Sequence, residues 1–429
     1  MEKLIQRFAK IGVSIPNILL PNSSVDMQKW SAVACDQFSS ERHYWQGAEQ
    51  FVGEAPSTLK MILPECYLED GDTVERVQKI QDTMTEYIND KVLTETTPGF
   101  IFIERKTPFA PCRQGLVVSV DLETYDYRPG TTPATRPTEG TVIDRLPPRM
   151  DIRREAILDM PHIMVLIDDK ENTLFSTISD NQASLETVYD FDLMTEGGHI
   201  KGQKISDQAT LEKVCAVLEG LKSDDGFLFA VGDGNHSLAA AKGIWEERKA
   251  AGASDDDAGR YALVEIENIY DPSLEFEPIH RVLFNIVSDD FKAALAANFD
   301  FNIEKYDTFA EMEKAFYAVT GTHAFGMMCS NGFAVLTVNK PETSLDYEVL
   351  QTFLDQYLND NPATHIDYIH GSESTIELGT AAGNIGIMMK GISKDTFFSE
   401  IQANGPLPRK TFSIGEAIEK RFYVESRSI

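Results

Sequence analysis

A turn with several polar side chains lies near the middle of the chain, where Gly232 to Ser237 read Gly-Asp-Gly-Asn-His-Ser. An apolar run, Phe227 to Val231, precedes this turn and an alanine-rich stretch follows it. That pattern predicts a strand, a tight turn and a helix. Because the free backbone amides at the start of a helix attract phosphate, the turn is a candidate anion-binding site.

The side chains of the turn suit chemistry at a phosphate. Gly232 and Gly234 would permit positive φ angles and the close approach of a ligand. Asp233 and His236 would present a carboxylate and an imidazole to that ligand, the two groups that most often bind or move protons. The turn therefore combines a predicted anion site with two candidate catalytic groups.

A plain strand-to-helix turn explains the same residues without chemistry, with Asn235 or Ser237 as the helix cap and His236 packed locally. No Gly-Lys-Ser/Thr follows, so the turn is not a Walker motif. The chain also lacks the Gly-x-Ser-x-Gly, His-Glu-x-x-His and Gly-x-Gly-x-x-Gly patterns. Serine hydrolases, zincins and Rossmann dehydrogenases are thereby disfavoured.

A second group of polar residues lies in the proline-rich stretch 127–150, whose irregular sequence predicts a long loop. Arginines in this stretch could form a local positive pocket for an anion. A surface loop with ordinary salt bridges is the alternative. The segment "TRPTEGTVIDRLPPR" supplies the candidates Arg136, Thr138, Glu139, Thr141, Arg145 and Arg149.

Two further segments carry weaker signals. "LPRKTFSIGEA" places Lys410 and Thr411 late in the chain, where a lead-in to a helix would also explain them. Asp168 and Asp169 end an apolar strand that begins at His162. They suggest a metal site, although adjacent aspartates at the end of a strand usually form a turn.

The composition limits the partners. The chain has 429 residues and a formal net charge of −29, and its acidic residues are spread along the chain. Such a charge repels duplex DNA and anionic membranes, so no nucleic acid and no membrane is expected as a partner. An anionic substrate would need a positive pocket made by nearby arginines, lysines or helix amides.

The apolar runs have the length of strands, so no transmembrane helix is predicted. The N-terminal segment lacks the pattern of a secretory signal. The five cysteines are widely spaced, which argues against a disulfide framework or a zinc knuckle and fits a reducing cytoplasm. A cytoplasmic protein is the expectation.

The order of predicted strands and helices indicates an α/β fold with mixed sheets. Helices are expected over 72–92, 206–221 and 237–249, and a hairpin-like pair of strands over 99–104 and 115–123. The predicted division is an N-terminal segment over 1–95, a core with the turn over 96–285, and a further C-terminal α/β layer over 286–429.

Several separated motifs resemble domain-of-unknown-function family 1015, in its longer bacterial branch, across nearly the whole chain. They are "WSAVACDQFSS", "STLKMILPE", "RPTEGTVIDRLPPR", "PHIMVLIDD", "GDGNHSLA" and "LPRKTFSIGEA". The mark of this family is an Asp-Gly-x-His turn that opens a helix, as Asp233 to His236 do here.

The same turn resembles that of the ParB/sulfiredoxin superfamily, which includes an archaeal ADP-dependent kinase of free serine. The resemblance implies a ParB/sulfiredoxin-like core. It also implies that Glu139 of "RPTE" is the catalytic base and that Asp233 and His236 belong to the phosphate and substrate site. Lys410 and Thr411 of "PRKT" would correspond to the late Pro-Lys-Thr segment of that kinase.

The turn departs from that kinase at one point. Where the kinase has His-His-Arg, this chain has Asn235, His236 and Ser237, so the phosphate-binding arginine is absent. In its place, the backbone amides, Arg136 or Lys410 would bind the phosphate.

These observations favour a small-molecule phosphotransferase that uses ADP or ATP, with Mg²⁺, and acts on free serine or another small hydroxylated metabolite. In this hypothesis Gly232, Gly234, Asn235 and Ser237 hold the phosphate, with help from Arg136 and Thr138. A ParB-like nucleotide-binding switch without turnover is the first alternative. A phosphoester hydrolase whose metal is held by Asp168, Asp169 or Asp233 is the second.

Overall fold

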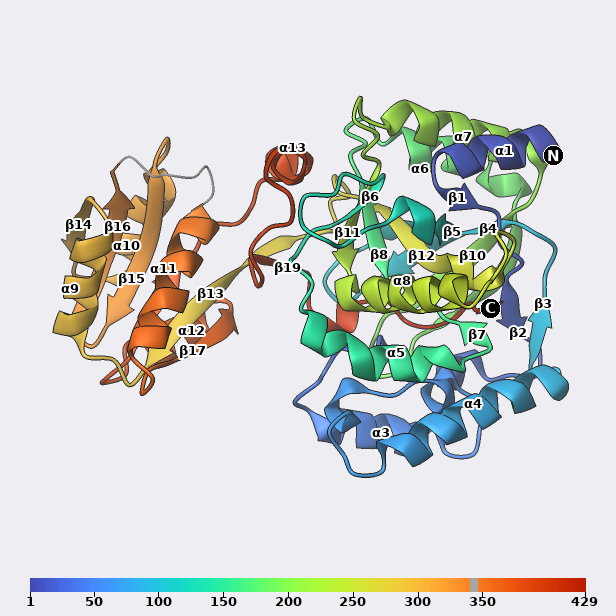
Figure 1. The fold of residues 1–429 in the computed structure, drawn as a ribbon, viewed down its shortest axis with the longest axis horizontal. Helices are drawn as coiled ribbons and strands as arrows, with labels where there is room; N and C mark the ends of the chain where they lie inside the picture. Colours follow the sequence, from blue (N-terminus) through green and yellow to red (C-terminus); the bar gives the residue numbers. More distant parts are fainter. Residues whose placement is uncertain (340–345) are drawn as a thin grey trace. The chain divides into compact units, whose positions relative to one another are not determined.

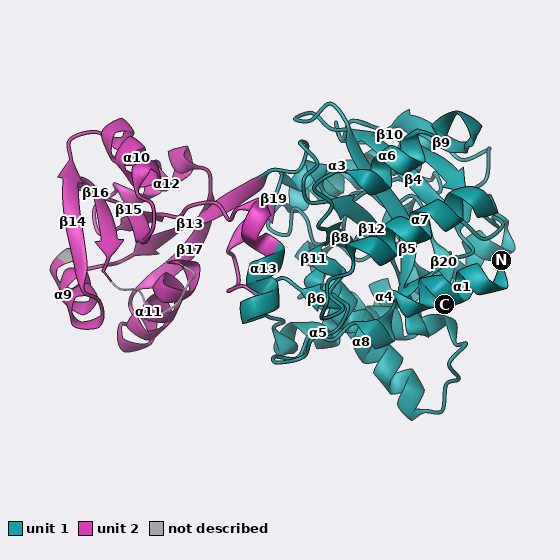
Figure 2. Ribbon diagram, turned by 90° about the horizontal axis from the view of Figure 1, so that it is seen from above, with its two compact units in different colours: residues 1–275, 398–406, 414–429 teal, residues 276–397, 407–413 magenta. Residues whose placement is uncertain are grey.

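The computed structural model describes residues 1–339 and 346–429, which form two compact units. Unit 1 comprises residues 1–275, 398–406 and 414–429, and unit 2 comprises residues 276–397 and 407–413 (Figure 2). These boundaries differ from those predicted at 95 and 285. Residues 1–95 share a core with the end of the chain, and a strand that begins at Phe276 belongs to the sheet of unit 2.

Unit 1, all of whose residues are described, is built on a nine-stranded mixed sheet with the strand order β6-β11-β8-β12-β5-β4-β10-β9, and β1 pairs with β5 (Figure 1). The β6–β11 and β8–β12 pairs are parallel, and the other pairs are antiparallel. The predicted α/β class with mixed sheets is therefore confirmed. The strands are β1 (Val13–Ser14), β4 (Phe100–Lys106), β5 (Arg113–Asp121), β6 (Thr135–Pro137), β8 (Met164–Ile167), β9 (Glu186–Asp192), β10 (His199–Ile205), β11 (Phe229–Asp233) and β12 (Tyr261–Asn268).

Both faces of this sheet are covered because its strands are apolar on both sides. Phe100 and Phe102 of β4 point to one face, where they share a core with α1 (Glu2–Lys10), α6 (Thr173–Ser179), α7 (Gln208–Leu221) and α8 (Asn235–Ala250). Ile101 and Ile103 point to the other face. There they share a core with α2 (Met27–Trp30), α3 (Arg42–Val52), α4 (Thr73–Asn89) and the C-terminal residues 422–424.

Two short strand pairs complete unit 1. They are β2 (Leu19–Pro21) with β3 (Leu93–Glu95), and β7 (Leu158–Asp159) with β20 (Arg427–Ser428). The second pair ties the end of the chain to the middle of unit 1. A residue near the C-terminus can therefore contribute to a site on the main sheet.

Unit 2 contains a second sheet. Seven described strands form it in the order β14-β16-β15-β18-β13-β17, with β19 paired to β13. The strands are β13 (Phe276–Phe284), β14 (Phe301–Tyr306), β15 (His323–Cys329), β16 (Gly332–Val338), β17 (His365–His370), β18 (Ile385–Met388) and β19 (Phe412–Ile414). The helices of unit 2 are α9 (Ser288–Asn298), α10 (Phe309–Ala318), α11 (Asp346–Asp360) and α12 (Ser372–Gly379). A further helix, α13 (Lys394–Asn404), begins in unit 2, but its residues from Phe398 onward belong to unit 1. The predicted C-terminal α/β layer thus contains its own sheet.

The predicted hairpin is confirmed, since β4 and β5 pair antiparallel. The long loop predicted over 127–150 is wrong in part, because it contains β6 and the start of α5 (Leu146–Arg154). Pro147 and Pro148 fall in the first turn of α5. Proline is tolerated there because the first amides of a helix have no partner within the helix.

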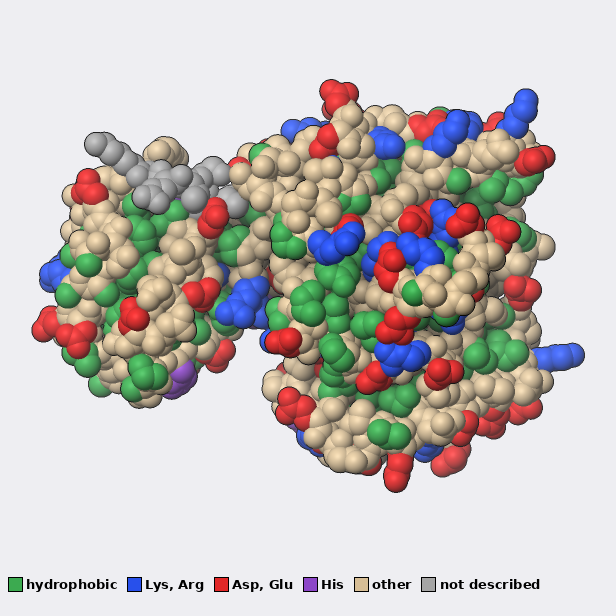
Figure 3. All heavy atoms as spheres, viewed as in Figure 1, with side chains coloured by type: hydrophobic (Ala, Val, Ile, Leu, Met, Phe, Trp, Pro, Cys, Tyr) green, Lys and Arg blue, Asp and Glu red, His purple; other side chains and the backbone are tan. Residues whose placement is uncertain are grey.

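The acidic side chains are scattered over the face shown in Figure 3, in agreement with the spread of charge along the sequence. None of the described helices combines the length and the apolar character that a crossing of the bilayer requires.

His199, at the start of β10, provides a pH-dependent contact at the edge of the sheet. Its Nδ1 lies 2.7 Å from Asp192 Oδ1 and its Nε2 lies 2.7 Å from Asp190 Oδ1. The hydrogen bond to Asp192 and then the one to Asp190 raise the pKa of His199 above its ordinary value of 6.5, against a smaller opposing effect of burial. The stabilisation is complete below the unfolded-state pKa and is lost as the pH rises through the raised pKa.

We expect a histidine NMR titration to give His199 a midpoint above 6.5, and Asp192→Asn to lower that midpoint. Asp82→Asn, on an exposed position of α4, is the control and should leave the midpoint unchanged. A wild-type midpoint at or below 6.5 would contradict the contact.

Candidate active site

The site is assembled where β6 lies beside β11. The two strands pair in parallel, with Ala230 opposite Arg136 and Val231 opposite Pro137 (Figure 1). Both strands therefore end at the same edge of the sheet. The "RPTE" segment begins in β6 and continues beyond it with Thr138 and Glu139, and the turn begins at the end of β11 with Gly232 and Asp233. The two strongest predicted motifs therefore lie together.

A set of buried hydrogen bonds holds these two segments in register. The Thr138 backbone amide donates to Asn235 Oδ1 over 3.2 Å, and the Thr138 hydroxyl donates to the Val231 carbonyl over 2.6 Å. Asn235 Nδ2 lies 3.3 Å from both Thr138 Oγ1 and the Val231 carbonyl. The side chains of Asn235 and Thr138 are thus used to join the segments, and the phosphate-binding role predicted for these two residues remains a prediction.

We predict that Asn235→Ala lowers the free energy of unfolding by about 1–3 kcal/mol, because it leaves the buried Thr138 amide without its acceptor. Urea denaturation of the full chain measures this change. Asn89→Ala, at the exposed end of α4, is the matched control and should leave the transition in place. Equal urea midpoints for the two variants would show that the hydrogen bonds between Asn235 and Thr138 contribute no stability.

Gly234 shapes the turn by its backbone. It occupies the N-cap of α8 with a left-handed φ of 78°, and a Cβ at this position would lie 3.1 Å from Ile163 Cα. A glycine is therefore required for both conformation and space. Since a glycine has no side chain to cap the helix, the first amides of α8 need other acceptors, which is the property that suits an anion.

Asp233 is held from two sides. One carboxylate oxygen accepts the Gly234 amide over 3.0 Å, and the other lies 3.5 Å from Lys420 Nζ. The Lys420 side chain is 8% exposed. Lys420 therefore places a positive charge beside the turn, and sequence reasoning missed it. Its segment, "IEKRFYVE", contains no pattern that links it to Asp233.

His236 and Glu139 lie on the two joined segments. His236 Nε2 accepts a hydrogen bond from the Val142 amide over 3.3 Å, so the helix start also holds the residues that follow Glu139. Glu139 is half-buried and follows Thr138 directly. Ser237, in the first turn of α8, is half-buried as well. The catalytic roles predicted for Glu139, Asp233 and His236 remain predictions.

Arg136 has partners within unit 1. Its side chain donates to the Asp225 carboxylate over 2.7 Å and to the Pro133 carbonyl over 3.0 Å, and it stacks on the Phe227 ring. Burial raises the pKa of Asp225, but hydrogen bonds from Ser223 and Arg136 hold it well below its usual range. The guanidinium of Arg136 is thus engaged with Asp225, which lies outside the turn, whereas the carboxylate partner of Lys420, Asp233, belongs to the turn itself.

The other predicted site residues are Lys410, Thr411, Asp168 and Asp169. Lys410 and Thr411 belong to unit 2, where the buried Thr411 hydroxyl donates to the Pro408 carbonyl, and their contribution to the site stays a prediction. The buried Asp169 carboxylate accepts the Leu174 amide over 2.8 Å, which ties it to the start of α6. Asp168 is exposed. Within residues 1–339 and 346–429, no three acidic, histidine or cysteine side chains gather into a metal centre.

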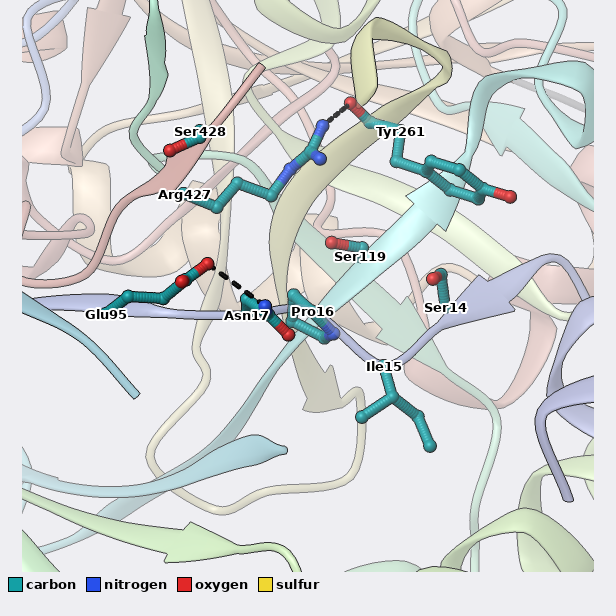
Figure 4. A pocket seen from close by; sticks show the side chains of 9 residues that line it. All are labelled: Ser14, Ile15, Pro16, Asn17, Glu95, Ser119, Tyr261, Arg427 and Ser428. Atoms are coloured by element: carbon teal, nitrogen blue, oxygen red, sulfur yellow. Dashed lines mark hydrogen bonds between the residues drawn. The ribbon is translucent and has the colours of Figure 1, made fainter. Parts of the chain in front are cut away.

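Unit 1 also contains a pocket of about 260 Å³, shown in Figure 4. Asn17, Glu95, Ser119 and Arg427 are among its lining residues, and Asn17 donates to Glu95 over 3.0 Å. The Arg427 guanidinium is used within the protein, since it donates to the carbonyl of Tyr261 and to that of Ala258. None of the predicted site residues lines this pocket, so it is separate from the candidate site.

Comparison with known families identifies the chain's relatives. Residues 19–357 match the family described as "Protein of unknown function (DUF1015)". The chain belongs to this family. The resemblance inferred from the separated motifs is thereby confirmed for DUF1015, whereas a relationship to the ParB/sulfiredoxin superfamily remains a prediction. No curated protein matches the chain.

Solved structures resemble this DUF1015 member at low identity. A conserved hypothetical protein from Pyrococcus furiosus is 11% identical, with a TM-score of 0.37, over 73% of this chain and 94% of that chain. A free serine kinase in complex with AMP is 11% identical, with a TM-score of 0.40, over 72% and 90%. A variant of a free serine kinase in complex with ADP is 10% identical, with a TM-score of 0.41, over 75% and 94%. At these scores the likeness assigns no chemistry to the chain.

Proposed function

We propose that this DUF1015 member is a nucleotide-dependent phosphotransferase that acts on a small hydroxylated metabolite. The observation that carries the proposal is the parallel pairing of β6 with β11, locked by Asn235 and Thr138. This pairing brings a half-buried glutamate, Glu139, to the same edge of the sheet as an uncapped helix start and a buried lysine. A base, an anion-binding backbone and a cation are the parts that phosphoryl transfer requires.

The phosphate of the nucleotide is assigned to the start of α8. Backbone amides there point toward a bound anion, and the helix dipole favours negative charge at this end. Gly232 and Gly234 contribute through the backbone they shape, because Leu166 and Ile414 pack beside Gly232 and Ile163 packs beside Gly234. Asn235 and Ser237 contribute their backbone amides. Lys420, whose Nζ lies 3.5 Å from Asp233, adds the positive charge.

Glu139 is assigned the role of general base. It accepts the proton of the acceptor hydroxyl while the hydroxyl oxygen forms a bond to the transferred phosphorus. The bond between that phosphorus and the nucleotide's bridging oxygen breaks, and the nucleotide leaves with the electron pair. In phosphoryl transfer the protein contributes mainly positioning and charge. The rate would therefore depend on the register between β6 and β11, which places Glu139 near the start of α8.

Mg²⁺ is proposed as part of the nucleotide complex. Its ligands would be the phosphate oxygens and the Asp233 carboxylate, an oxygen donor of the kind that this ion prefers. When bound, the ion would neutralise charge on the phosphates. The Asp233 carboxylate accepts the Gly234 amide and lies 3.5 Å from Lys420 Nζ.

Free serine is the leading acceptor, because the "RPTE" and "GDGNHS" motifs resemble those of the free-serine kinase group. His236, through its bond to Val142, would hold the loop that carries Glu139 rather than touch the reacting atoms.

The decisive test incubates the full chain with ADP or ATP, Mg²⁺ and a pool of hydroxylated metabolites, followed by mass spectrometry. A new phosphometabolite that is lost in Glu139→Gln and Asp233→Asn and retained in the exposed control Glu54→Gln supports the proposal. Nucleotide binding without any product would instead favour a ParB-like switch. Release of phosphate from esters without nucleotide would favour the hydrolase.

A calorimetric titration with the nucleotide tests the cation separately. Lys420→Ala should weaken binding by about 10- to 100-fold, the range expected when a charge-assisted hydrogen bond to phosphate is lost. Lys60→Ala, in a separate part of unit 1, serves as the control. Equal affinities would remove Lys420 from the site.

A further inference from the structure

A buried tyrosine and a half-buried histidine form a hydrogen-bonded couple beside the turn. Tyr423 is 2% exposed, and its hydroxyl lies 2.8 Å from His162 Nδ1. The same hydroxyl accepts the Cys35 backbone amide over 3.3 Å. The couple therefore joins three distant parts of unit 1, and none of its residues has a role in the mechanism proposed above.

The couple is attached to the proposed site at two points. Ile163, the neighbour of His162, packs against Gly234 so closely that a Cβ there would lie 3.1 Å from Ile163 Cα. Tyr423 lies on the same C-terminal segment as Lys420, which reaches Asp233. Backbone hydrogen bonds hold this segment along residues 32–34, since the Ala34 amide donates to Arg421 and the Tyr423 amide donates to Ala32, each over 2.8 Å.

The hydrogen bonds determine the tautomer of the histidine. Burial raises the pKa of Tyr423 well above its ordinary value, so the phenol keeps its proton. The Cys35 amide occupies one lone pair of the phenol oxygen, and the imidazole nitrogen is a better acceptor for the phenol proton than a thiol. When Tyr423 donates to His162 Nδ1, the remaining ring nitrogen, Nε2, is the one that can donate to a ligand.

Charged groups surround the couple. Glu65, which forms an ion pair with Arg149, has a pKa raised mainly by burial and is influenced by Arg149, Asp36 and His162. Burial also raises the pKa of the Cys35 thiol, so that sulfur stays protonated and is not a nucleophile. His162 is thus the group of this cluster that is best suited to donate a hydrogen bond to a neutral ligand.

We infer that His162 is the acceptor-binding residue of the proposed phosphotransferase, with its Nε2–H donated to the hydroxyl oxygen of a small metabolite and with Tyr423 as its positioning residue. The inference rests on the proposed function. It gives the acceptor oxygen two contacts, since the oxygen accepts from His162 and donates its proton to Glu139. Such a pair of contacts would orient a lone pair of the oxygen toward the phosphorus.

The kinetic test compares variants in the phosphotransfer assay. His162→Ala should raise the KM for the acceptor by about 10- to 100-fold with nucleotide affinity unchanged, the cost expected for one hydrogen bond. His162→Gln, which retains a donor near the Nε2 position, should recover part of this loss. An unchanged acceptor KM in His162→Ala would overturn the inference, and the exposed control His43→Gln should match the wild type.

A second measurement does not depend on activity. Nitrogen NMR of the full chain should show His162 with its proton on Nε2, and Tyr423→Phe should convert this signal to a mixture of tautomers. The pool of hydroxylated metabolites should shift the Nε2 signal in the wild type. If no phosphometabolite forms but the signal shifts, the phosphotransferase proposal fails while the binding site stands. A proton on Nδ1, or no shift with any metabolite, overturns the assignment of His162.

Discussion

Glu139→Gln is expected to lower the rate of phosphoryl transfer by about 10²- to 10⁴-fold, the usual contribution of a positioned general base. Glutamine keeps the size of the side chain and removes its basicity, so the joint between Thr138 and Asn235 should remain. Nucleotide affinity should therefore be unchanged. Single-turnover kinetics at saturating nucleotide, with Glu54→Gln as the exposed control, measure the effect.

The pH dependence of the same rate provides a check on this role. A general base must be ionised, so the wild-type rate should fall at acidic pH if a carboxylate accepts the proton. The residual rate of Glu139→Gln should lack this acidic limb. If Glu139→Gln keeps both the wild-type rate and the decrease of that rate at acidic pH, another group accepts the proton.

The second large effect is predicted for Arg421, which lies fully buried between two carboxylates. Its guanidinium forms ion pairs with Glu265 and Glu425, all three side chains being 3% exposed or less. Although burial opposes it, these carboxylates raise the pKa of Arg421 above its ordinary value. Gly115 makes room for the group, because a Cβ there would lie 1.9 Å from Glu265 Oε1.

Arg421→Met should lower the free energy of unfolding of unit 1 by about 3–5 kcal/mol, because it leaves two buried carboxylates without a counter-charge. Urea denaturation followed by tryptophan fluorescence measures the loss, since Trp30, Trp45 and Trp245 all lie in the cores of unit 1. Arg128→Met removes an exposed ion pair with Asp126 and should leave the transition almost unchanged.

The Arg421 network also supports the proposed site. Arg421 is flanked by Lys420, which meets Asp233, and its segment continues to Tyr423, which meets His162. If Arg421→Met proves as stable as the control, the ion pairs do not hold this segment in place. Removing all three charges, by adding Glu265→Gln and Glu425→Gln, should recover part of the lost stability.

Local patterns were enough to predict the elements around the turn. The apolar run before Gly232 and the alanine-rich stretch after it correspond to β11 and α8, and α8 begins at Asn235, two residues before the predicted start at 237. Glycine positions and apolar periodicity determine local structure over a few residues, so they can be predicted from a short stretch of sequence. The proline-rich stretch was misjudged because prolines that break a helix interior also fit the first turn of α5.

The use of individual side chains was harder to predict. Arg136 and Asn235 carry the groups that bind phosphate, yet the structure engages Arg136 with Asp225 and Asn235 with Thr138. Both contacts follow from the register in which β6 pairs with β11. A polar side chain in a motif can bind a ligand or join two segments, and its type alone does not distinguish the two uses.

Composition and short motifs sufficed for the α/β class, the DUF1015 family and the chemical character of the turn, because these properties are encoded within single segments. The partners of the turn required the folded chain. Lys420 reaches Asp233 and Tyr423 reaches His162 only because the C-terminal segment returns to the main sheet and lies along residues 32–34. That return is determined by many weak apolar and backbone contacts across unit 1, and no short sequence pattern specifies which lysine meets which carboxylate.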